Sequence, residues 1–317
     1  MNELEHAVHV ALSVCLGLKP SETLLVLADP PLHDLAYAFV RGGRTLAKEV
    51  IFVEYGQRAR NGEEPPEPVP TLMQKVDAVL AATSRSITHT KARRDATAAG
   101  ARVATMPGIT EDMLIRTMTA DYEAIAEKTR FVAELLTKAS VARVVTPAGT
   151  DVTLPITGIR AIASTGLIRE PGQWGNLPSG EAYLMPEEGK TQGVIVVDGA
   201  LAGIGLLREP VRIQVENGQV VSVEGGEQAR EFAQQLEAVG PLARNVAELG
   251  VGTNPKAKVT GAILEDEKVL GTVHIAFGNN VSMGGTVDVP FHVDGILLKP
   301  TLWLDGELLL ENGQPRF

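Results

Sequence analysis

The alternation of short apolar runs with helical stretches over roughly the first 140 residues constrains the fold more than any other feature. The apolar runs have the length of strands and lie at 23–29, 50–55, 77–83 and 101–107. Helical patterns separate or follow them at about 34–48, at 91–100 and, over a longer stretch, at about 110–138. Strands that alternate with helices in this way predict a parallel, doubly wound sheet of the Rossmann-like kind.

Glycine is distributed unevenly and marks a change of character along the chain. Only seven of the 32 glycines precede Gly149, and this bias favours turns and short strands over helices in the later part. One run of alternating apolar and polar residues surrounds Asn217-Gly218, and another surrounds Asp305-Gly306. Dipeptides of this kind between alternating runs are the strongest short signal for a β-hairpin.

We therefore predict two domains with a boundary near residue 140. Residues 1–140 are expected to form a Rossmann-like, doubly wound α/β domain. Residues 141–317 are expected to form a β-rich α+β domain, interrupted by one helix at about 227–238. Proline and glutamate crowd residues 58–70, which are expected to form an exposed loop of the first domain.

The composition and charge of the chain disfavour several classes of function. Of its 317 residues, 44% are hydrophobic and 21% are charged, as in packed globular proteins. The formal net charge of -10 argues against nucleic acid or an anionic membrane as the main partner, because both bind basic surfaces. No apolar run is long enough to span a bilayer, and a start that carries Glu3 and Glu5 does not fit a secretory signal. With Cys15 as its single cysteine, the protein is expected to be cytoplasmic.

Two common kinds of catalytic motif do not occur in the sequence. The turn after the first apolar run, ADPPLHD, lacks the glycines that let a backbone approach a pyrophosphate, and no Walker A motif occurs elsewhere. There is no Gly-x-Ser-x-Gly nucleophile elbow, and Cys15 falls on the apolar face of the first helix, as a buried inert thiol would. A dinucleotide site and a nucleophilic hydrolase are therefore disfavoured.

Histidines in the later half of the chain indicate a metal site. His292 and Asp294, in FHVDG, are two residues apart on a predicted strand, so their side chains point to the same face and can meet one ion. His274 interrupts the apolar run Val-His-Ile-Ala-Phe, where a buried imidazole needs a partner. Either a metal ion or another polar group could satisfy it.

Two acidic residues add to this set. Glu181 lies in the turn GNLPSGEAY and Glu248 in NVAELGVGTNP, where a charge is unusual without a partner or a metal ion. Asp266 and Glu267, in LEDEKVLGT, fit a solvated turn. Imidazole and carboxylate donors in this number suit a pair of divalent ions with shared carboxylates. A smaller set of two histidines and one carboxylate would instead suit one ferrous ion.

The stretches NLPSGEAY, AELGVGTNP, EDEKVLGTVHIAFG and HVDG occur in this order, and together they resemble the thermophilic aminopeptidase T family of metallopeptidases. The resemblance covers most of the chain. It implies an aminopeptidase site with two divalent metal ions, which would be zinc, cobalt or manganese. It also implies a homodimer. The ligands that it implies are Glu181, Glu248, His274, His292 and Asp294.

The chain departs from this family at one position. Family peptidases carry a tyrosine seven residues after the first histidine ligand, and this chain has Val281 there, which cannot donate a hydrogen bond. The same superfamily includes a dihydroxypyridine ring-cleaving dioxygenase, in which two histidines and an aspartate hold one iron. The corresponding set here would be His274, His292 and Asp294.

Three functions are consistent with these patterns. The first, which we expect over the others, is a metallo-aminopeptidase that hydrolyses N-terminal peptide bonds with a metal-activated water. Glu248 would act as the base, and Glu267 is a second candidate for the proton carrier. The second is a mononuclear iron(II) dioxygenase that opens a dihydroxypyridine ring, and the third is a non-catalytic metal-binding protein. The substrate would be a peptide or another small molecule.

Overall fold

The computed structural model describes residues 2–317, which form two compact units. The first unit comprises Met1–Ala126 and Thr165–Ser179, and the second comprises Glu127–Ser164 and Gly180–Phe317. The chain therefore leaves the first unit after Ala126 and returns to it at Thr165. The pair of domains with a boundary at residue 140 stays a prediction.

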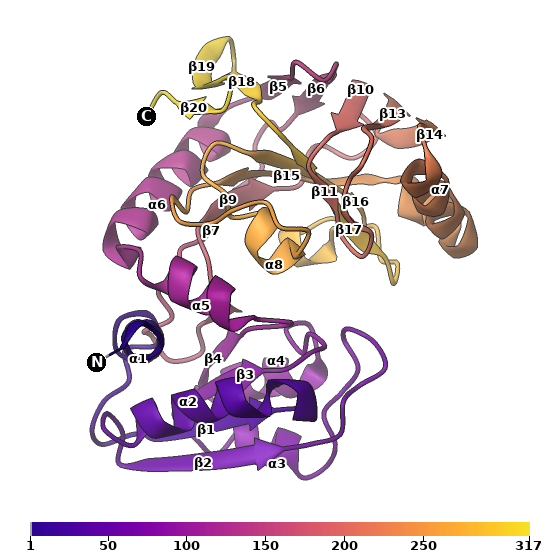
Figure 1. Cartoon of the computed structure of the whole chain (residues 1–317). Helices are drawn as coiled ribbons and strands as arrows, with labels where there is room; N and C mark the ends of the chain where they lie inside the picture. Colours follow the sequence, from indigo (N-terminus) through magenta and orange to yellow (C-terminus); the bar gives the residue numbers. More distant parts are fainter. Residues whose placement is uncertain (1) are drawn as a thin grey trace. The chain divides into compact units, whose positions relative to one another are not determined.

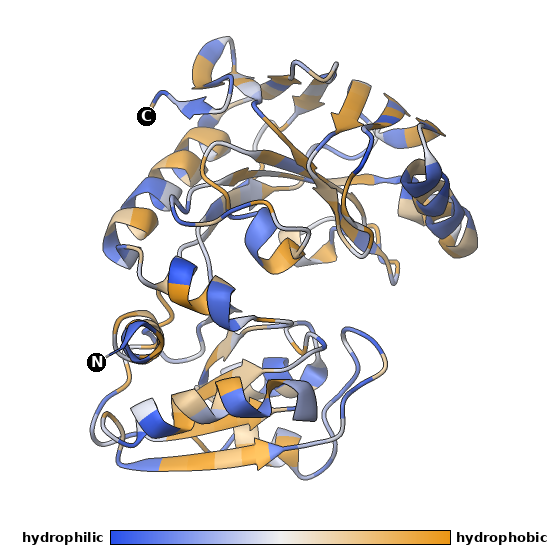
Figure 2. Cartoon of the chain, viewed as in Figure 1, coloured by the Kyte–Doolittle hydropathy of each residue, from blue (hydrophilic) through white to orange (hydrophobic). Residues whose placement is uncertain are grey.

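A parallel five-stranded sheet forms the centre of the first unit, in the order β2-β1-β3-β4-β8 (Figure 1). Its strands are β1 (Thr23–Ala28), β2 (Glu49–Glu54), β3 (Ala78–Ala82), β4 (Arg102–Thr105) and β8 (Trp174–Asn176). The first four are the predicted apolar runs, and Figure 2 shows β1 and β2 as hydrophobic over most of their length. The predicted α/β fold is confirmed. No pattern predicted β8, which belongs to the returning segment.

Short helices accompany this sheet. They are α1 (Glu3–His9), which continues as a π-helix over Val10–Cys15, then a 3-10 turn at Pro30–Leu32, α2 (His33–Gly43), α3 (Val69–Met73), α4 (Lys91–Ala98) and α5 (Glu111–Met118). Cys15 is fully buried, and this burial raises the pKa of its thiol, as expected of an inert cysteine. No helix in residues 2–317 is long and apolar enough to pass through a lipid bilayer.

The single long helix predicted at about 110–138 is wrong, because the chain forms two helices there. After α5 ends, α6 begins afresh at Tyr122 and extends to Lys138. Asp121 lies just before it, and its Oδ1 accepts hydrogen bonds from the backbone N–H of Glu123 (3.0 Å) and Ala124 (3.1 Å). A carboxylate in this position satisfies amides that have no partner within a helix, so it favours a new helix start.

Two antiparallel sheets make up most of the second unit (Figure 1). The eight-stranded sheet, ordered β14-β13-β10-β6-β5-β18-β19-β20, contains β5 (Val141–Val145), β6 (Asp151–Pro155), β10 (Gln192–Val197), β13 (Val211–Glu216), β14 (Gln219–Glu224), β18 (Thr301–Leu304), β19 (Glu307–Glu311) and β20 (Gln314–Pro315). The seven-stranded sheet, ordered β12-β11-β17-β16-β15-β9-β7, contains β7 (Ile162–Ser164), β9 (Glu181–Leu184), β11 (Ala200–Leu201), β12 (Gly205–Leu206), β15 (Val246–Gly252), β16 (Val273–Gly278) and β17 (His292–Leu297). The remaining helical segments are α7 (Glu227–Val239), α8 (Ile263–Asp266) and two 3-10 turns, Pro241–Arg244 and Val281–Met283.

Both predicted hairpins are present in the eight-stranded sheet. β13 and β14 join through Asn217 (φ 49°) and Gly218 (φ 70°). β18 and β19 join through Asp305 (φ 50°) and Gly306 (φ 90°). Positive φ at both central residues of a two-residue loop matches the twist of the flanking strands, which explains why these dipeptides predict the turn.

One hydrophobic core lies between the two sheets of the second unit. The face of the seven-stranded sheet that is turned away from this core is the polar one. The core includes Ile213 from the eight-stranded sheet and Leu249 and Ile275 from the seven-stranded sheet. Side chains alternate between faces along a strand. Glu248 and His274, which precede Leu249 and Ile275, therefore lie on the face turned away from the core.

Candidate metal centre

The five predicted ligand residues share this polar face of the seven-stranded sheet. They are Glu181 on β9, Glu248 on β15, His274 on β16, and His292 and Asp294 on β17. The register places His274 opposite Gly250, two residues after Glu248, and places Asp294 opposite Ala276, two residues after His274. Because side chains two residues apart point the same way, the pairing brings distant parts of the sequence together.

Donor atoms on this face, together with Glu267 from the end of α8, form two groups of three, and within each group all of them lie within 4.8 Å of one another. The open group consists of Glu248, His292 and Asp294, and the closed group consists of Glu181, Glu267 and His274. Each group offers one imidazole and two carboxylates, a donor set that suits a divalent ion. The sequence-based triad of His274, His292 and Asp294 is thus divided between the two groups.

The open group has an oriented imidazole. His292 Nε2 lies 3.5 Å from Glu248 Oε2 and 3.6 Å from Asp294 Oδ1. His292 Nδ1 lies 2.8 Å from the carbonyl oxygen of Asn279, which can only accept a hydrogen bond, so Nδ1 carries a proton and donates. This bond directs Nε2 toward the carboxylates, as in protein metal sites. The side chain of His292 is 35% exposed, whereas both carboxylates are buried.

In the closed group Glu181 and His274 are buried and Glu267 is partly buried, and a lysine contacts both carboxylates. His274 Nε2 lies 3.6 Å from Glu181 Oε2, and Lys268 Nζ lies 2.7 Å from Glu181 Oε1. Lys268 also forms an ion pair with Glu267, and its side chain is buried. Within residues 2–317, His274 Nδ1 and Glu181 Oε2 are buried without a hydrogen-bond partner. Unpaired buried donors and acceptors are costly, so the cluster as a whole fits a site for a cation.

Two features tie the groups together and shape them. Glu248 is shared, because its Oε1 lies 3.2 Å from His274 Nε2 while its Oε2 faces His292. Gly250 makes room for the His274 ring, since a Cβ on this glycine would lie 2.0 Å from His274 Nε2. Gly252 makes room for another segment, because a Cβ there would lie 2.1 Å from the carbonyl oxygen of Val269. The glycines of AELGVG therefore shape the site as well as the strand.

The charges of the cluster shift the pKa values of its members. Burial alone would lower the pKa of His274, but the hydrogen bond with Glu248 and the charge of Glu181 raise it to about 9. Burial opposes ionisation of Glu248, but its hydrogen bonds with His274 and His292 lower its pKa to about 2. Burial and the charge of Glu181 raise the pKa of Glu267 to about 8.

Metal binding is expected to weaken as the pH falls. Burial would lower the pKa of His292, but Asp294 and Glu248 raise it well above its ordinary value, so its ring is protonated at neutral pH when no ion is bound. A metal ligand must be neutral at Nε2, so binding an ion releases this proton. Calorimetric titration with Mn²⁺ in two buffers of different ionisation enthalpy measures the released protons. An affinity unchanged between about pH 6 and pH 8 would contradict the expectation.

The surroundings of three consecutive residues, Asp266, Glu267 and Lys268, were not predicted from the sequence, although Glu267 was a candidate proton carrier. Asp266 and Glu267 were expected in a solvated turn, and this is wrong for both. Asp266 is fully buried and accepts hydrogen bonds from the backbone N–H of Thr260 (2.6 Å) and Gly261 (2.9 Å), while Glu267 belongs to the closed group. Lys268 was not singled out, because a lysine within LEDEK has the sequence context of a surface residue.

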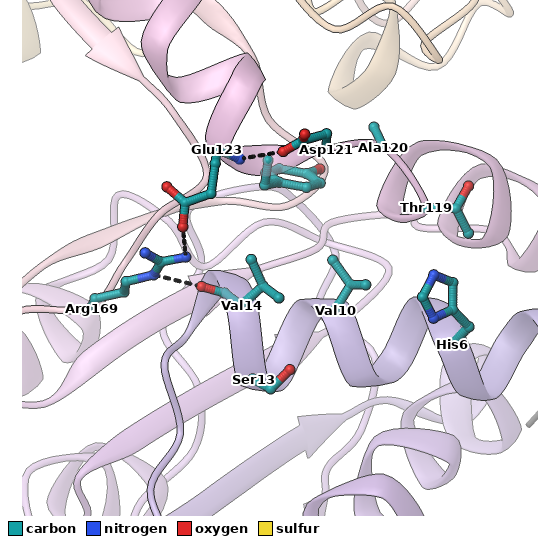
Figure 3. A pocket seen from close by; sticks show the side chains of 10 residues that line it. His6, Val10, Ser13, Val14, Thr119, Ala120, Asp121, Glu123 and Arg169 are labelled. Carbon is teal, nitrogen blue, oxygen red and sulfur yellow. Dashed lines mark hydrogen bonds and ion pairs between the residues drawn. The ribbon is translucent and has the colours of Figure 1, made fainter.

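A cavity in the first unit is a less suitable candidate site. Figure 3 shows this cavity of about 510 Å³, which is lined in part by His6, Val10 and Arg169. Arg169 donates from Nη2 to Glu123 Oε1 (2.6 Å) and from Nε to the carbonyl oxygen of Val14 (2.7 Å). The carboxylate of Glu123 balances the charge of Arg169. Among residues 2–317, the groups close enough to share an ion lie on the seven-stranded sheet and at the end of α8.

The fold and this cluster define a class of protein: an α/β protein with a candidate metal centre on an antiparallel sheet. The chain belongs to the 2,5-dihydroxypyridine 5,6-dioxygenase family, whose family model matches residues 12–316. A relative of this name from Pseudomonas putida KT2440 is 26% identical over 192 residues. The match covers 56% of this chain and 55% of the relative, and so spans about half of each.

Two solved structures share the fold. The structure of 2,5-dihydroxypyridine dioxygenase from Pseudomonas putida KT2440 has a TM-score of 0.84 at 19% identity, covering 99% of this chain and 98% of that chain. Wild-type AmpT from Thermus thermophilus has a TM-score of 0.74 at 19% identity, covering 99% of both chains. At this identity each likeness shows a common fold.

The aminopeptidase interpretation is therefore wrong, and with it the assignment of the protein as a hydrolase. The family match and the Pseudomonas putida relative both bear the name of the dioxygenase, and the likeness to AmpT extends to the fold alone. The residue types could not separate the two functions, because both were expected to use histidines and carboxylates at the same positions. Val281, at the position of the peptidase tyrosine, lies in a 3-10 turn and is 47% exposed. The predicted homodimer stays a prediction.

Proposed function

We propose that this protein is a metal-dependent dioxygenase that opens the ring of a dihydroxypyridine, with one ferrous ion bound by Glu248, His292 and Asp294. The observation that carries the proposal is the match of the dioxygenase family over residues 12–316 in a chain whose open group has an oriented imidazole and two carboxylates. Imidazole and carboxylate donors suit divalent iron. A small aromatic substrate replaces the peptide that the sequence first suggested.

The residues of the open group would each have a defined task. A ferrous ion, when bound, supplies the one-electron chemistry that lets dioxygen react with a hydroxylated ring. The carbonyl of Asn279 holds His292 so that Nε2 faces the carboxylates of Glu248 and Asp294. His274 holds Glu248 through Oε1 (3.2 Å) and leaves Oε2 directed toward His292.

Substrate access and proton transfer would involve different residues of the cluster. The partial exposure of His292 marks where a substrate ring can approach the open group, since Glu248 and Asp294 are buried. A hydroxypyridine must give up hydroxyl protons as its ring opens. Burial and the charge of Glu181 raise the pKa of the Glu267 carboxyl group to about 8, so its protonation changes near neutral pH. We therefore assign the proton carrier to Glu267 in preference to Glu248, whose pKa is about 2.

Oxygen uptake tests the proposed function directly. Protein stripped of metal and reloaded with ferrous ion under anaerobic conditions is expected to consume 2,5-dihydroxypyridine and dioxygen in equal amounts. With ¹⁸O₂, both labelled atoms are expected in the product, which mass spectrometry detects. A chelator should stop the reaction, and added ferrous ion should restore it. Folded, iron-loaded protein that leaves the substrate intact would reject this function and favour a metal-binding protein without catalysis.

A further inference from the structure

We propose that Lys268 is a built-in cation of the closed group, so that the cluster binds one exchangeable divalent ion, at the open group, instead of two. The proposal deepens the proposed function, because it sets the number of ions that the site can hold. It rests on that function only in taking the cluster to bind a metal, and it does not depend on the identity of the substrate.

The ammonium of Lys268 already occupies the carboxylates that a second ion would need. Its Nζ lies 2.7 Å from Glu181 Oε1 and is ion-paired with Glu267, and these are the two carboxylates of the closed group. The Lys268 side chain is 1% exposed. A buried ammonium is stabilised by such carboxylate partners. If a metal ion displaced it from them, it would lose this stabilisation, which opposes binding of the ion.

Backbone hydrogen bonds hold the segment that carries Lys268 in place. The carbonyl oxygen of Lys268 accepts a hydrogen bond from Asn254 N–H (2.8 Å), and Leu270 N–H donates to the carbonyl oxygen of Asn254 (3.1 Å). A Cβ on Gly252 would lie 2.1 Å from Val269 O and 2.8 Å from the carbonyl carbon of Lys268. Glycine at 252 therefore lets this segment lie directly against β15, at the residue that pairs with Glu181 of β9.

Charge explains why the two groups should differ in the ion that they take. The ion-pair partners of Glu248 and Asp294 are histidines, which a metal ion can deprotonate and use as ligands. The partner of Glu181 and Glu267 is a lysine, which has no lone pair to offer while it is charged. A divalent ion in the closed group would lie beside this ammonium, and like charges at such short distance repel strongly.

The lysine also gives His274 a different task. In a two-metal site the ions lie about 3.5–4 Å apart and share carboxylates, and His274 would then bind the second ion. With Lys268 in place, the shorter contact of His274 Nε2 is with Glu248 Oε1 at 3.2 Å, and Glu181 Oε2 lies at 3.6 Å. His274 is then a positioning residue that orients Glu248 for the ion in the open group.

The number of ions bound by the unmodified protein is the first test. Protein stripped of metal is dialysed to equilibrium against Mn²⁺ and, separately, Co²⁺, and the bound ions are counted by elemental analysis. We expect about one ion per chain at saturation, in place of the pair that a dinuclear site holds. About two ions per chain would overturn the proposal. This count requires no variant and no catalytic activity.

Variants of Lys268 are the second test. Lys268→Ala removes the ammonium and is expected to raise the count to about two ions per chain, with an exchange-coupled Mn²⁺ pair in the electron paramagnetic resonance spectrum. Lys268→Arg keeps the positive charge and should stay at about one. Lys190→Ala, which removes an exposed lysine paired with Glu187, is the matched control and should not change the count.

The outcomes separate this proposal from the proposed function. If folded Lys268→Ala still binds about one ion, the lysine is not what excludes the second, and the proposal is overturned. If Lys268→Ala does not fold, the count for the unmodified protein and for Lys268→Arg decides. A count of one without oxygen uptake would leave the role of Lys268 supported while rejecting the dioxygenase activity.

Discussion

Replacing His292 with alanine is expected to lower the affinity for ferrous ion by more than about 100-fold and to abolish ring cleavage. Residues that merely support metal ligands contribute about 10–100-fold to metal affinity, so loss of a ligand itself should exceed this range. The loss should be severe because His292 is the imidazole of the open group, and its Nε2 faces both Glu248 and Asp294. Equilibrium dialysis against ferrous ion and oxygen uptake measure the two effects.

The design of this experiment can separate metal binding from folding. The side chain of His292 is 35% exposed, so its removal should leave only a small cavity, and urea unfolding of the metal-free variant measures the cost of leaving Glu248 and Asp294 without this partner. His9→Ala, an exposed histidine on α1, is the matched control and should keep both metal and activity. If His292→Ala retained ferrous ion at the affinity of the unmodified protein, the open group would not be the metal site.

Replacing Gly250 with alanine is expected to disrupt the site although it removes no donor atom. The new Cβ would lie 2.0 Å from Nε2 and 2.1 Å from Cε1 of His274, distances at which the ring has to move. His274 is fully buried, so the movement should cost about 1–3 kcal/mol of the free energy of unfolding, as for other overpacked cores. Its hydrogen bond with Glu248 should also be lost, which should weaken metal binding by about 10–100-fold.

A glycine elsewhere in the chain offers the control for this steric argument. A Cβ on Gly56 would meet no atom within 4 Å, so Gly56→Ala should leave both unfolding and metal binding unchanged. Urea unfolding of the metal-free proteins and dialysis against ferrous ion measure the two quantities. Unchanged metal affinity in Gly250→Ala would show that the orientation of His274 does not matter to the ion.

Local signals explain why much of the fold could be predicted from the sequence. The apolar runs of the parallel sheet and the hairpins at Asn217-Gly218 and Asp305-Gly306 depend on residues close together in the chain. The spacing of His292 and Asp294 placed both on one face of a strand for the same reason. That these residues share a sheet face with Glu181 depends on strand register, and the family resemblance supplied what spacing alone could not.

The parts that could not be predicted depend on contacts between distant residues. Lys268 follows two acidic residues in a run that reads as solvated surface, and its burial depends on Gly252 and Asn254. The pairing of β8 with β4 joins Val103 to Trp174, which no local pattern signals. The choice between hydrolase and dioxygenase failed for another reason, since the two chemistries share their donor types and only comparison along the whole chain distinguished them.

The return of the chain to the parallel sheet has a consequence for anyone who wishes to produce its parts separately. β8 is an edge strand, and it comes from Thr165–Ser179, beyond the segment that gives the eight-stranded sheet β5 and β6. A gene fragment truncated at residue 140 would encode β4 and β3 but not β8. The unpaired edge of β4 would then expose backbone N–H and C=O groups that other chains can bind. Each unit is encoded by two separate stretches of the gene. To produce one unit alone, its two stretches have to be joined by a linker, because a single truncation does not separate the units.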